Sequence, residues 1–141
     1  MRKIALVFIA LFVVKSCGLI NKQIEPVTNY KKQEVKEKKI VVTATMYMAT
    51  VGQCDSTPLI TACGRKINPI KASEHKWIAV SRDLLKVFKY GDKVKLSNAG
   101  KKNGIYTITD TMNKRFKNKI DILETEGTPL YKLTSVVLTK V

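Results

Sequence analysis

Two aspartates in the C-terminal half of the chain stand where a carboxyl group is able to do chemistry. Asp110 follows the largely β-branched run Ile105–Thr109, and Asp121 lies inside the short apolar segment Ile120–Leu123. Aspartate is a poor strand former, and side chains alternate between the two faces of a strand. If the isoleucines on either side of Asp121 enter the core, its carboxyl group faces outward, where a general acid or base is useful.

The basic residues between these two aspartates support a second interpretation. The segment Lys114–Lys119 contains four lysine or arginine residues, which would keep neighbouring carboxylates ionised. In that interpretation, Asp110 and Asp121 only form salt bridges. From the residues alone, this structural role is favoured over catalysis.

The cysteines and the single histidine give little support for metal or thiol chemistry. His75 lies in a charged segment and is interpreted as a surface residue, and a nucleophilic cysteine would need a base beside it. In an exported protein, Cys54 and Cys63 would instead oxidise and staple the loop Gly52–Gly64. We therefore expect a disulfide here, and neither a metal ion nor a cofactor.

The N-terminal segment has the pattern of an export signal. Arg2 and Lys3 precede the apolar run Ile4–Val14, whose eleven residues are fewer than the ~20 that a membrane span needs. The residues before Cys17 resemble the lipobox of bacterial lipoproteins. We expect residues 1–16 to be a signal peptide and Cys17 to carry the lipid that anchors the exported chain to a bacterial membrane. Ordinary secretion and an uncleaved anchor are the alternatives.

The 141 residues and the net charge of +15 fit one small basic domain on a tether. Residues 17–39 are polar and lysine-rich, so we expect a flexible tether, with the domain in residues 40–141. The charge favours polyanionic surroundings, such as the phosphates of a cell envelope, or simply a soluble surface. Export argues against nucleic acid as a partner, and a single apolar run excludes a bundle of membrane helices.

Short apolar segments with a period of two residues predict a mainly β domain. The six predicted strands are Ile40–Met48, Lys76–Val80, Asp92–Ser97, Gly104–Thr109, Ile120–Leu123 and Ser135–Val141. Between the second and third strands, Ser81–Phe88 is expected to form a short helix with Ser81 as its N-cap, and Leu130–Leu133 is expected to form a single helical turn. Six short strands in about 100 residues favour a small closed barrel, which leaves no exposed strand edge.

Five parts of the chain resemble, in order, the three-aspartate domain, a branch of the double-psi β-barrels. The same group includes the barrel of rare lipoprotein A and the membrane-bound lytic transglycosylase A family. The matching parts are Ala44–Tyr47, Ile60–Gly64, Trp77–Ser81, Tyr90–Val94 and the pair Thr109–Thr111 with Asn118–Ile122. The resemblance implies a small six-stranded double-psi β-barrel with one or two short helical turns.

The resemblance also implies that the protein cleaves peptidoglycan glycan strands as a lytic transglycosylase. In such an enzyme one carboxyl group protonates the glycosidic oxygen and then accepts the proton of the sugar's own 6-hydroxyl, as a 1,6-anhydro ring closes. By their match to the family, the expected site residues are Asp121 as acid and base, Asp110 as its neighbour, Asp83 as a weaker third carboxylate, Tyr47 and Thr61 as glycan contacts, and Lys119 as an orienting cation.

Two departures from the family pattern keep other functions open. The family's first aspartate falls on Ser81, and Met112 and Asn113 replace the two glycines that follow its second motif. Glycine lets a substrate approach the backbone closely, so the groove is expected to differ here. The alternatives are a barrel that binds glycan strands without cutting them, and a structural or inhibitory lipoprotein. We expect a monomer in the cell envelope.

Overall fold

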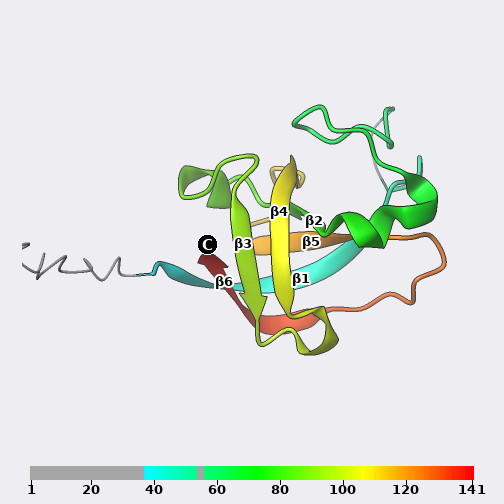
Figure 1. Ribbon diagram of the computed structural model, residues 1–141. Coiled ribbons are helices and arrows are strands. Elements are labelled where there is room, and N and C mark those ends of the chain that lie inside the picture. Colours follow the sequence, from blue (N-terminus) through cyan, green and yellow to red (C-terminus); the bar gives the residue numbers. More distant parts are fainter. Residues whose placement is uncertain (1–36, 54–55) are drawn as a thin grey trace, which may run out of the picture. The chain divides into compact units, whose positions relative to one another are not determined.

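The computed structural model describes residues 37–53 and 56–141, which contain a closed β-barrel (Figure 1). Its strands are β1 (Lys39–Met48), β2 (Trp77–Val80), β3 (Lys93–Ser97), β4 (Gly104–Thr111), β5 (Lys119–Glu124) and β6 (Leu133–Lys140). They close in the order β1-β5-β2-β4-β3-β6. The predicted mainly β fold, a small closed barrel of six strands, is confirmed, and each predicted strand end lies within about two residues of the observed one.

The pairing of the strands repeats across the barrel. β1 pairs with β5 in parallel, and β2 pairs with β4 in parallel, whereas β1–β6 and β3–β4 are antiparallel. Exchanging the first three strands with the last three therefore reproduces the same neighbours and the same directions. This two-fold pattern is the one expected of a double-psi β-barrel. One consequence is that β4 and β5, the strands that carry Asp110 and Asp121, flank the short strand β2.

The barrel interior is filled by apolar side chains from all six strands. Its buried members include Val42, Ile78, Val80, Val94, Leu96, Tyr106, Ile108, Ile120, Ile122, Val136 and Leu138. Side chains alternate between the two faces of a strand, so the burial of Ile120 and Ile122 turns Asp121 outward. The predicted orientation of Asp121 follows directly from the filling of this core.

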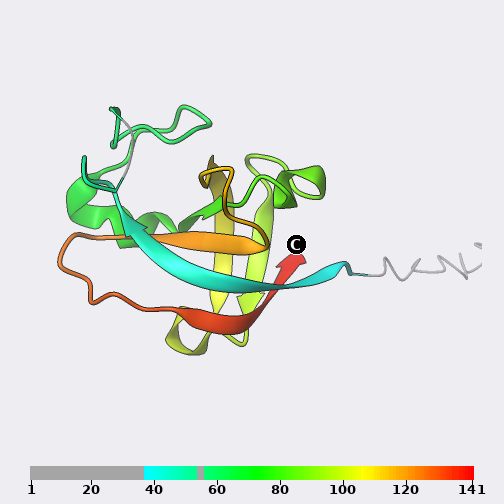
Figure 2. The ribbon, with the colours of Figure 1, turned by 180° about the vertical axis from the view of Figure 1, so that it is seen from behind.

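A second apolar cluster lies on the outer face of the barrel. Its buried members are Tyr47, Ile67, Ala72, Ala79, Met112 and Leu123. Ile67 and Ala72 belong to the connection between β1 and β2, which is drawn in green beside the ends of β1 and β5 (Figure 2). This connection therefore covers part of the face on which Asp121 lies.

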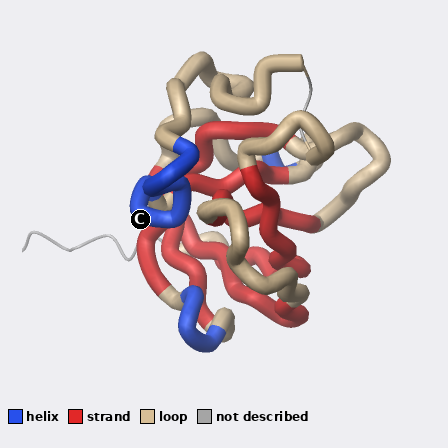
Figure 3. Tube along the Cα trace, turned by 90° about the vertical axis from the view of Figure 1, so that its right-hand side faces the viewer, coloured by secondary structure: helices blue, strands red, loops and turns tan. Residues whose placement is uncertain are grey.

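Helical structure in the described residues is limited to three short 3₁₀ segments, shown in blue in Figure 3. They are η1 (Pro69–His75), η2 (Leu84–Lys86) and η3 (Gly100–Lys102). The predicted helix Ser81–Phe88 is confirmed only as the single turn η2, which buries Leu84, because the chain then reverses at Gly91 to enter β3. Asp83, and not Ser81, is the residue at the N-cap. None of these segments has the length and hydropathy of a membrane-spanning helix.

The predicted helical turn at Leu130–Leu133 is wrong. This stretch contains no helix, and β6 begins at Leu133, two residues before the predicted start. The hydroxyl of Tyr131 donates a hydrogen bond to Oε1 of Glu124 at 2.6 Å. That contact holds the segment against the end of the barrel.

Glu124, at the end of β5, is a buried carboxylate that fastens one end of the barrel. Its side chain is 3% exposed and forms an ion pair with Nζ of Lys102. It also accepts hydrogen bonds from the hydroxyls of Tyr131 at 2.6 Å and Ser73 at 2.7 Å. Burial alone would raise the pKa of Glu124, but the hydrogen bonds from Lys102, Tyr131 and Ser73 hold it below its usual value. One carboxylate thus joins η1, η3, β5 and the segment before β6.

Candidate active site

Asp110 and Asp121 lie on the two strands that flank β2, and both pair with Ala79. Asp121 pairs with it in the antiparallel β2–β5 ladder, and Asp110 does so in the parallel β2–β4 ladder, after a register shift. On the other side, Asp121 pairs with Thr45 of β1. Paired residues point to the same face, so these four residues form one row on the outside of the barrel. Two strand spacings separate the Cα atoms of the two aspartates, roughly 10 Å.

The carboxyl group of Asp121 is half-buried and is held by a hydroxyl group. Oγ1 of Thr45 donates to Oδ1 of Asp121 and lies 3.5 Å from the carbonyl oxygen of Ile120. Burial raises the pKa of Asp121, while the Thr45 hydrogen bond and the charge of Lys119 oppose part of the rise. A carboxyl group that keeps its proton to higher pH than usual is suited to donate that proton to a substrate.

The carboxylate of Asp110 is bound mainly by backbone groups. Its Oδ1 accepts hydrogen bonds from the N–H groups of Ala62 at 3.1 Å and Thr111 at 2.8 Å. The hydroxyl of Tyr47 lies 3.5 Å from Oδ2. Asp110 therefore fastens the loop Thr61–Gly64 to the end of β4, and it places a carboxylate in the same row as Asp121.

The two predicted glycan contacts are largely enclosed by the protein. Tyr47 is 9% exposed and belongs to the outer apolar cluster, and Thr61 is 3% exposed. The Thr61 hydroxyl accepts a hydrogen bond from the N–H of Arg65 at 3.1 Å. Both side chains therefore shape the surroundings of Asp110 and offer little surface of their own to a glycan.

Asp83 does not join the row that contains Asp110 and Asp121. It lies at the N-cap of η2, and its Oδ2 accepts a hydrogen bond from the N–H of Asn118 at 2.9 Å. Burial opposes ionisation of this carboxyl group, but the hydrogen bonds from Asn118 and Ser81 bring its pKa below the usual value. The structure thus gives Asp83 a role in holding the residues that precede β5.

Lys119 lies on the same face of β5 as Asp121, since the two are separated by one residue. Its Nζ is 5.2 Å from the centre of the Phe116 ring. Its charge acts on Asp121 and stabilises the ionised form of that carboxyl group. Lys119 therefore lies next to Asp121 along β5, and its role as an orienting cation stays a prediction.

Several other predictions concern residues that the structure does not describe. Cys17 and Cys54 both lie outside the described residues, so the lipid anchor and the Cys54–Cys63 disulfide stay predictions.

His75, interpreted as a surface residue, is half-buried and stacks on Trp77 with ring centroids 4.2 Å apart. Within residues 37–53 and 56–141, no cluster of three or more His, Cys, Asp or Glu side chains could hold a metal ion.

Comparisons with protein families and with curated proteins give no match to this chain. The assignment of a function therefore depends on the geometry around Asp121 and on the motifs that the sequence carries.

Replacing Asp121 by asparagine is expected to stabilise the protein near neutral pH. The folded state raises the pKa of Asp121 above the usual 3.8, so it binds this proton more tightly than the unfolded chain does. That contribution to stability is present at acidic pH and is lost as the pH rises through the folded-state pKa. In thermal melts followed by circular dichroism, Asp121→Asn should raise Tm by roughly 3 °C at pH 7, and by less at pH 4.

The variant Glu126→Gln is the control for this measurement. Glu126 is exposed and follows β5, so the control removes a carboxylate without touching the row. Its Tm at each pH shows the effect of removing a carboxylate outside the row. A gain from Asp121→Asn that does not grow between pH 4 and pH 7 would contradict the raised pKa.

Removal of the Thr45 hydroxyl is expected to raise the pKa of Asp121 further. The hydroxyl donates to the carboxylate and so favours its ionised form. Valine has a similar volume but no hydroxyl to donate. Thr45→Val should move the ¹³C titration of the Asp121 carboxyl group to higher pH, whereas Thr45→Ser should leave it near the wild-type position. An unchanged titration in the valine variant would show that the hydrogen bond does not control this group.

Proposed function

We propose that this protein is an exported cell-wall protein that cleaves peptidoglycan glycan strands as a lytic transglycosylase. The observation that carries the proposal is the setting of Asp121, a half-buried carboxyl group with a raised pKa on the outer face of the barrel. Asp110 lies in the same row, on the far side of Ala79. The resemblance to the three-aspartate domain supplies the class of reaction.

In the proposed reaction Asp121 serves first as an acid and then as a base. Its protonated carboxyl group donates the proton to the glycosidic oxygen as the bond from that oxygen to C1 breaks. The resulting carboxylate takes the proton of the 6-hydroxyl while O6 bonds to C1 of the same sugar. Asp121 ends protonated as it began, and no water enters the products.

The residues around Asp121 suit the two halves of this cycle. The Thr45 hydroxyl donates to Asp121 when Asp121 is a carboxylate. When Asp121 is protonated, the same hydroxyl can donate to the nearby carbonyl oxygen of Ile120 instead. The negative charge of Asp110 in the same row would favour the positive charge that develops on the sugar as the glycosidic bond breaks. No cofactor enters these steps.

The direct test is to incubate the full-length chain, purified in mild detergent, with isolated peptidoglycan and to analyse the released sugars by mass spectrometry. Products ending in 1,6-anhydro sugars are expected. Reducing-end products would mean hydrolysis with a second carboxylate. If the protein sediments with the wall but releases no product, it is a barrel that binds glycan without cutting it. Asp110 would then have only the structural role that its backbone hydrogen bonds indicate.

A further inference from the structure

A basic loop adjoins the candidate active site. We use this name for residues 112–119, which connect β4 to β5 and end on Lys119. The loop contains no acidic residue, and its cations are Lys114, Arg115, Lys117 and Lys119. In the part of the chain that the structure describes, none of these four side chains lies within 4.0 Å of a carboxylate oxygen. These four cations therefore form no ion pair with the described part of the domain.

The basic loop is held at both ends by hydrogen bonds. At its start, the N–H of Met112 donates to the carbonyl oxygen of Val80 at 2.9 Å. At its end, the N–H of Asn118 donates to Oδ2 of Asp83 at 2.9 Å. Between these points, Phe116 packs against the outer apolar cluster. The cations are thus carried by a fixed backbone, which lowers the entropy cost of binding an anion.

Two of these cations lie against the Phe116 ring. The guanidinium carbon of Arg115 is 4.8 Å from the centre of the ring, and Nζ of Lys119 is 5.2 Å from it. Lys119 shares its face of β5 with Asp121. One aromatic side chain is therefore in contact with Arg115 and with Lys119, and Lys119 lies on the face of β5 that carries Asp121.

We propose that Arg115 and Lys119 bind a carboxylate carried by the peptide substituents of the glycan, so that the strand lies across Asp121. This inference rests on the proposed function, because it names the substrate group that the same site recognises. The planar guanidinium group of Arg115 can bind both oxygens of a carboxylate, and Lys119 adds a second charge. A neutral glycan without peptides offers this pair no partner.

Binding of such a carboxylate would also act on Asp121. In the free protein, burial raises the pKa of Asp121, and the charge of Lys119 opposes part of that rise. A carboxylate bound to Lys119 would offset that charge and favour the protonated form of Asp121. Substrate binding would thus help to prepare the acid that the first step needs.

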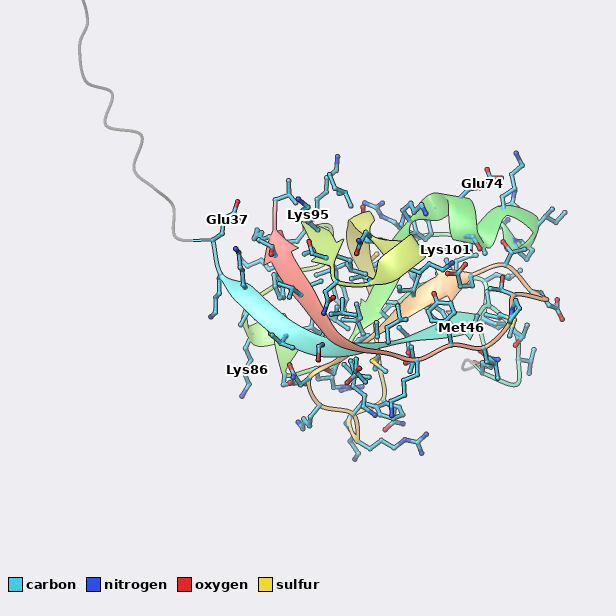
Figure 4. All side chains as sticks on the ribbon, turned by 90° about the horizontal axis from the view of Figure 1, so that it is seen from below. Glu37, Met46, Glu74, Lys86, Lys95 and Lys101 are labelled. Atoms are coloured by element: carbon cyan, nitrogen blue, oxygen red, sulfur yellow. The ribbon has the colours of Figure 1, made fainter. Side chains whose placement is uncertain are left out.

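The test measures binding to peptidoglycan from which phosphate polymers have been removed. Every protein in the test carries Asp121→Asn, so that the glycan is not cleaved during the measurement. Arg115→Gln/Lys119→Gln should raise the Kd in a sedimentation assay about tenfold, which corresponds to ~1.4 kcal/mol. The matched control is Lys93→Gln/Lys95→Gln, which removes two exposed lysines from β3. Lys95 is labelled beside Glu37 in Figure 4, and β3 lies three strands from β5 in the closed barrel. The control should change the Kd less than twofold.

Neutral chitin oligosaccharides are the ligand in the second part of the test. Asp121→Asn should bind them with the same affinity whether or not it also carries Arg115→Gln/Lys119→Gln. Equal losses in both double variants would overturn the inference, because they would show a general effect of charge. So would an absence of binding once phosphate polymers are removed. If the double variant does not fold by circular dichroism, Arg115→Gln alone replaces it, since Arg115 is exposed. A binding loss specific to the basic loop without any cleavage by the wild type would support the inference and reject the transglycosylase.

Discussion

Asp121→Asn is expected to lower the release of 1,6-anhydro sugars from peptidoglycan at least ~10³-fold. The amide can neither donate the proton that the glycosidic oxygen needs nor accept the proton of the 6-hydroxyl. The geometry should survive, because the amide oxygen of asparagine still accepts the hydrogen bond from Thr45. The measurement is the rate of product formation by mass spectrometry, with purified full-length protein at equal concentrations.

Two further variants separate catalysis from folding. Glu126→Gln removes an exposed carboxylate five residues beyond Asp121 and should keep the wild-type rate. Asp110→Asn should lower the rate less than Asp121→Asn does, because an amide oxygen still accepts from Ala62 and Thr111. If Asp121→Asn keeps more than about a tenth of the wild-type rate, Asp121 is not the acid and base, and another carboxyl group has to be sought.

Much of the barrel was predictable because its signals are local. Alternating segments such as Ile40–Met48 show the period of a strand within a few residues, and the observed β1 differs from that prediction by one residue. The outward direction of Asp121 follows from the same alternation. The helix predicted over Ser81–Phe88 is shortened to η2 because its end is decided by the core and by the return of the chain to β3, which no local pattern contains.

The composition of the site depends on strand pairing, which the sequence does not display. Thr45 lies 76 positions before Asp121 and gains its role only because β1 pairs with β5 in one particular register. Ala79 lies between the two aspartates only because the register shifts in the β2–β4 ladder. Glu124 received no predicted role, since its burial depends on Ser73, Lys102 and Tyr131 meeting at the end of the barrel. Detecting a matched pair of polar residues on distant strands would require a comparison of related sequences.

Lys102→Met is expected to lower the free energy of unfolding by roughly 3 kcal/mol at pH 7. Lys102 is the charged partner of Glu124, whose side chain is 3% exposed. Without Lys102, the buried carboxylate keeps its hydrogen bonds from Tyr131 and Ser73 but loses the opposite charge that offsets its desolvation. Urea unfolding followed by circular dichroism measures the difference. Lys101→Met makes the same change at an exposed neighbour, labelled in Figure 4, and should cost less than about 0.5 kcal/mol.

The dependence of this loss on pH identifies its cause. The folded state lowers the pKa of Glu124 below the usual 4.5, so its contribution to stability is present above that value and is lost as the pH falls through the folded-state pKa. The gap between the wild type and Lys102→Met should therefore shrink when unfolding is measured well below pH 4.5. Adding Glu124→Gln to Lys102→Met should recover part of the loss at pH 7, because the buried charge is then absent. A gap that stays constant with pH, or no recovery in the double variant, would assign the loss to the packing of the Lys102 side chain instead of its charge.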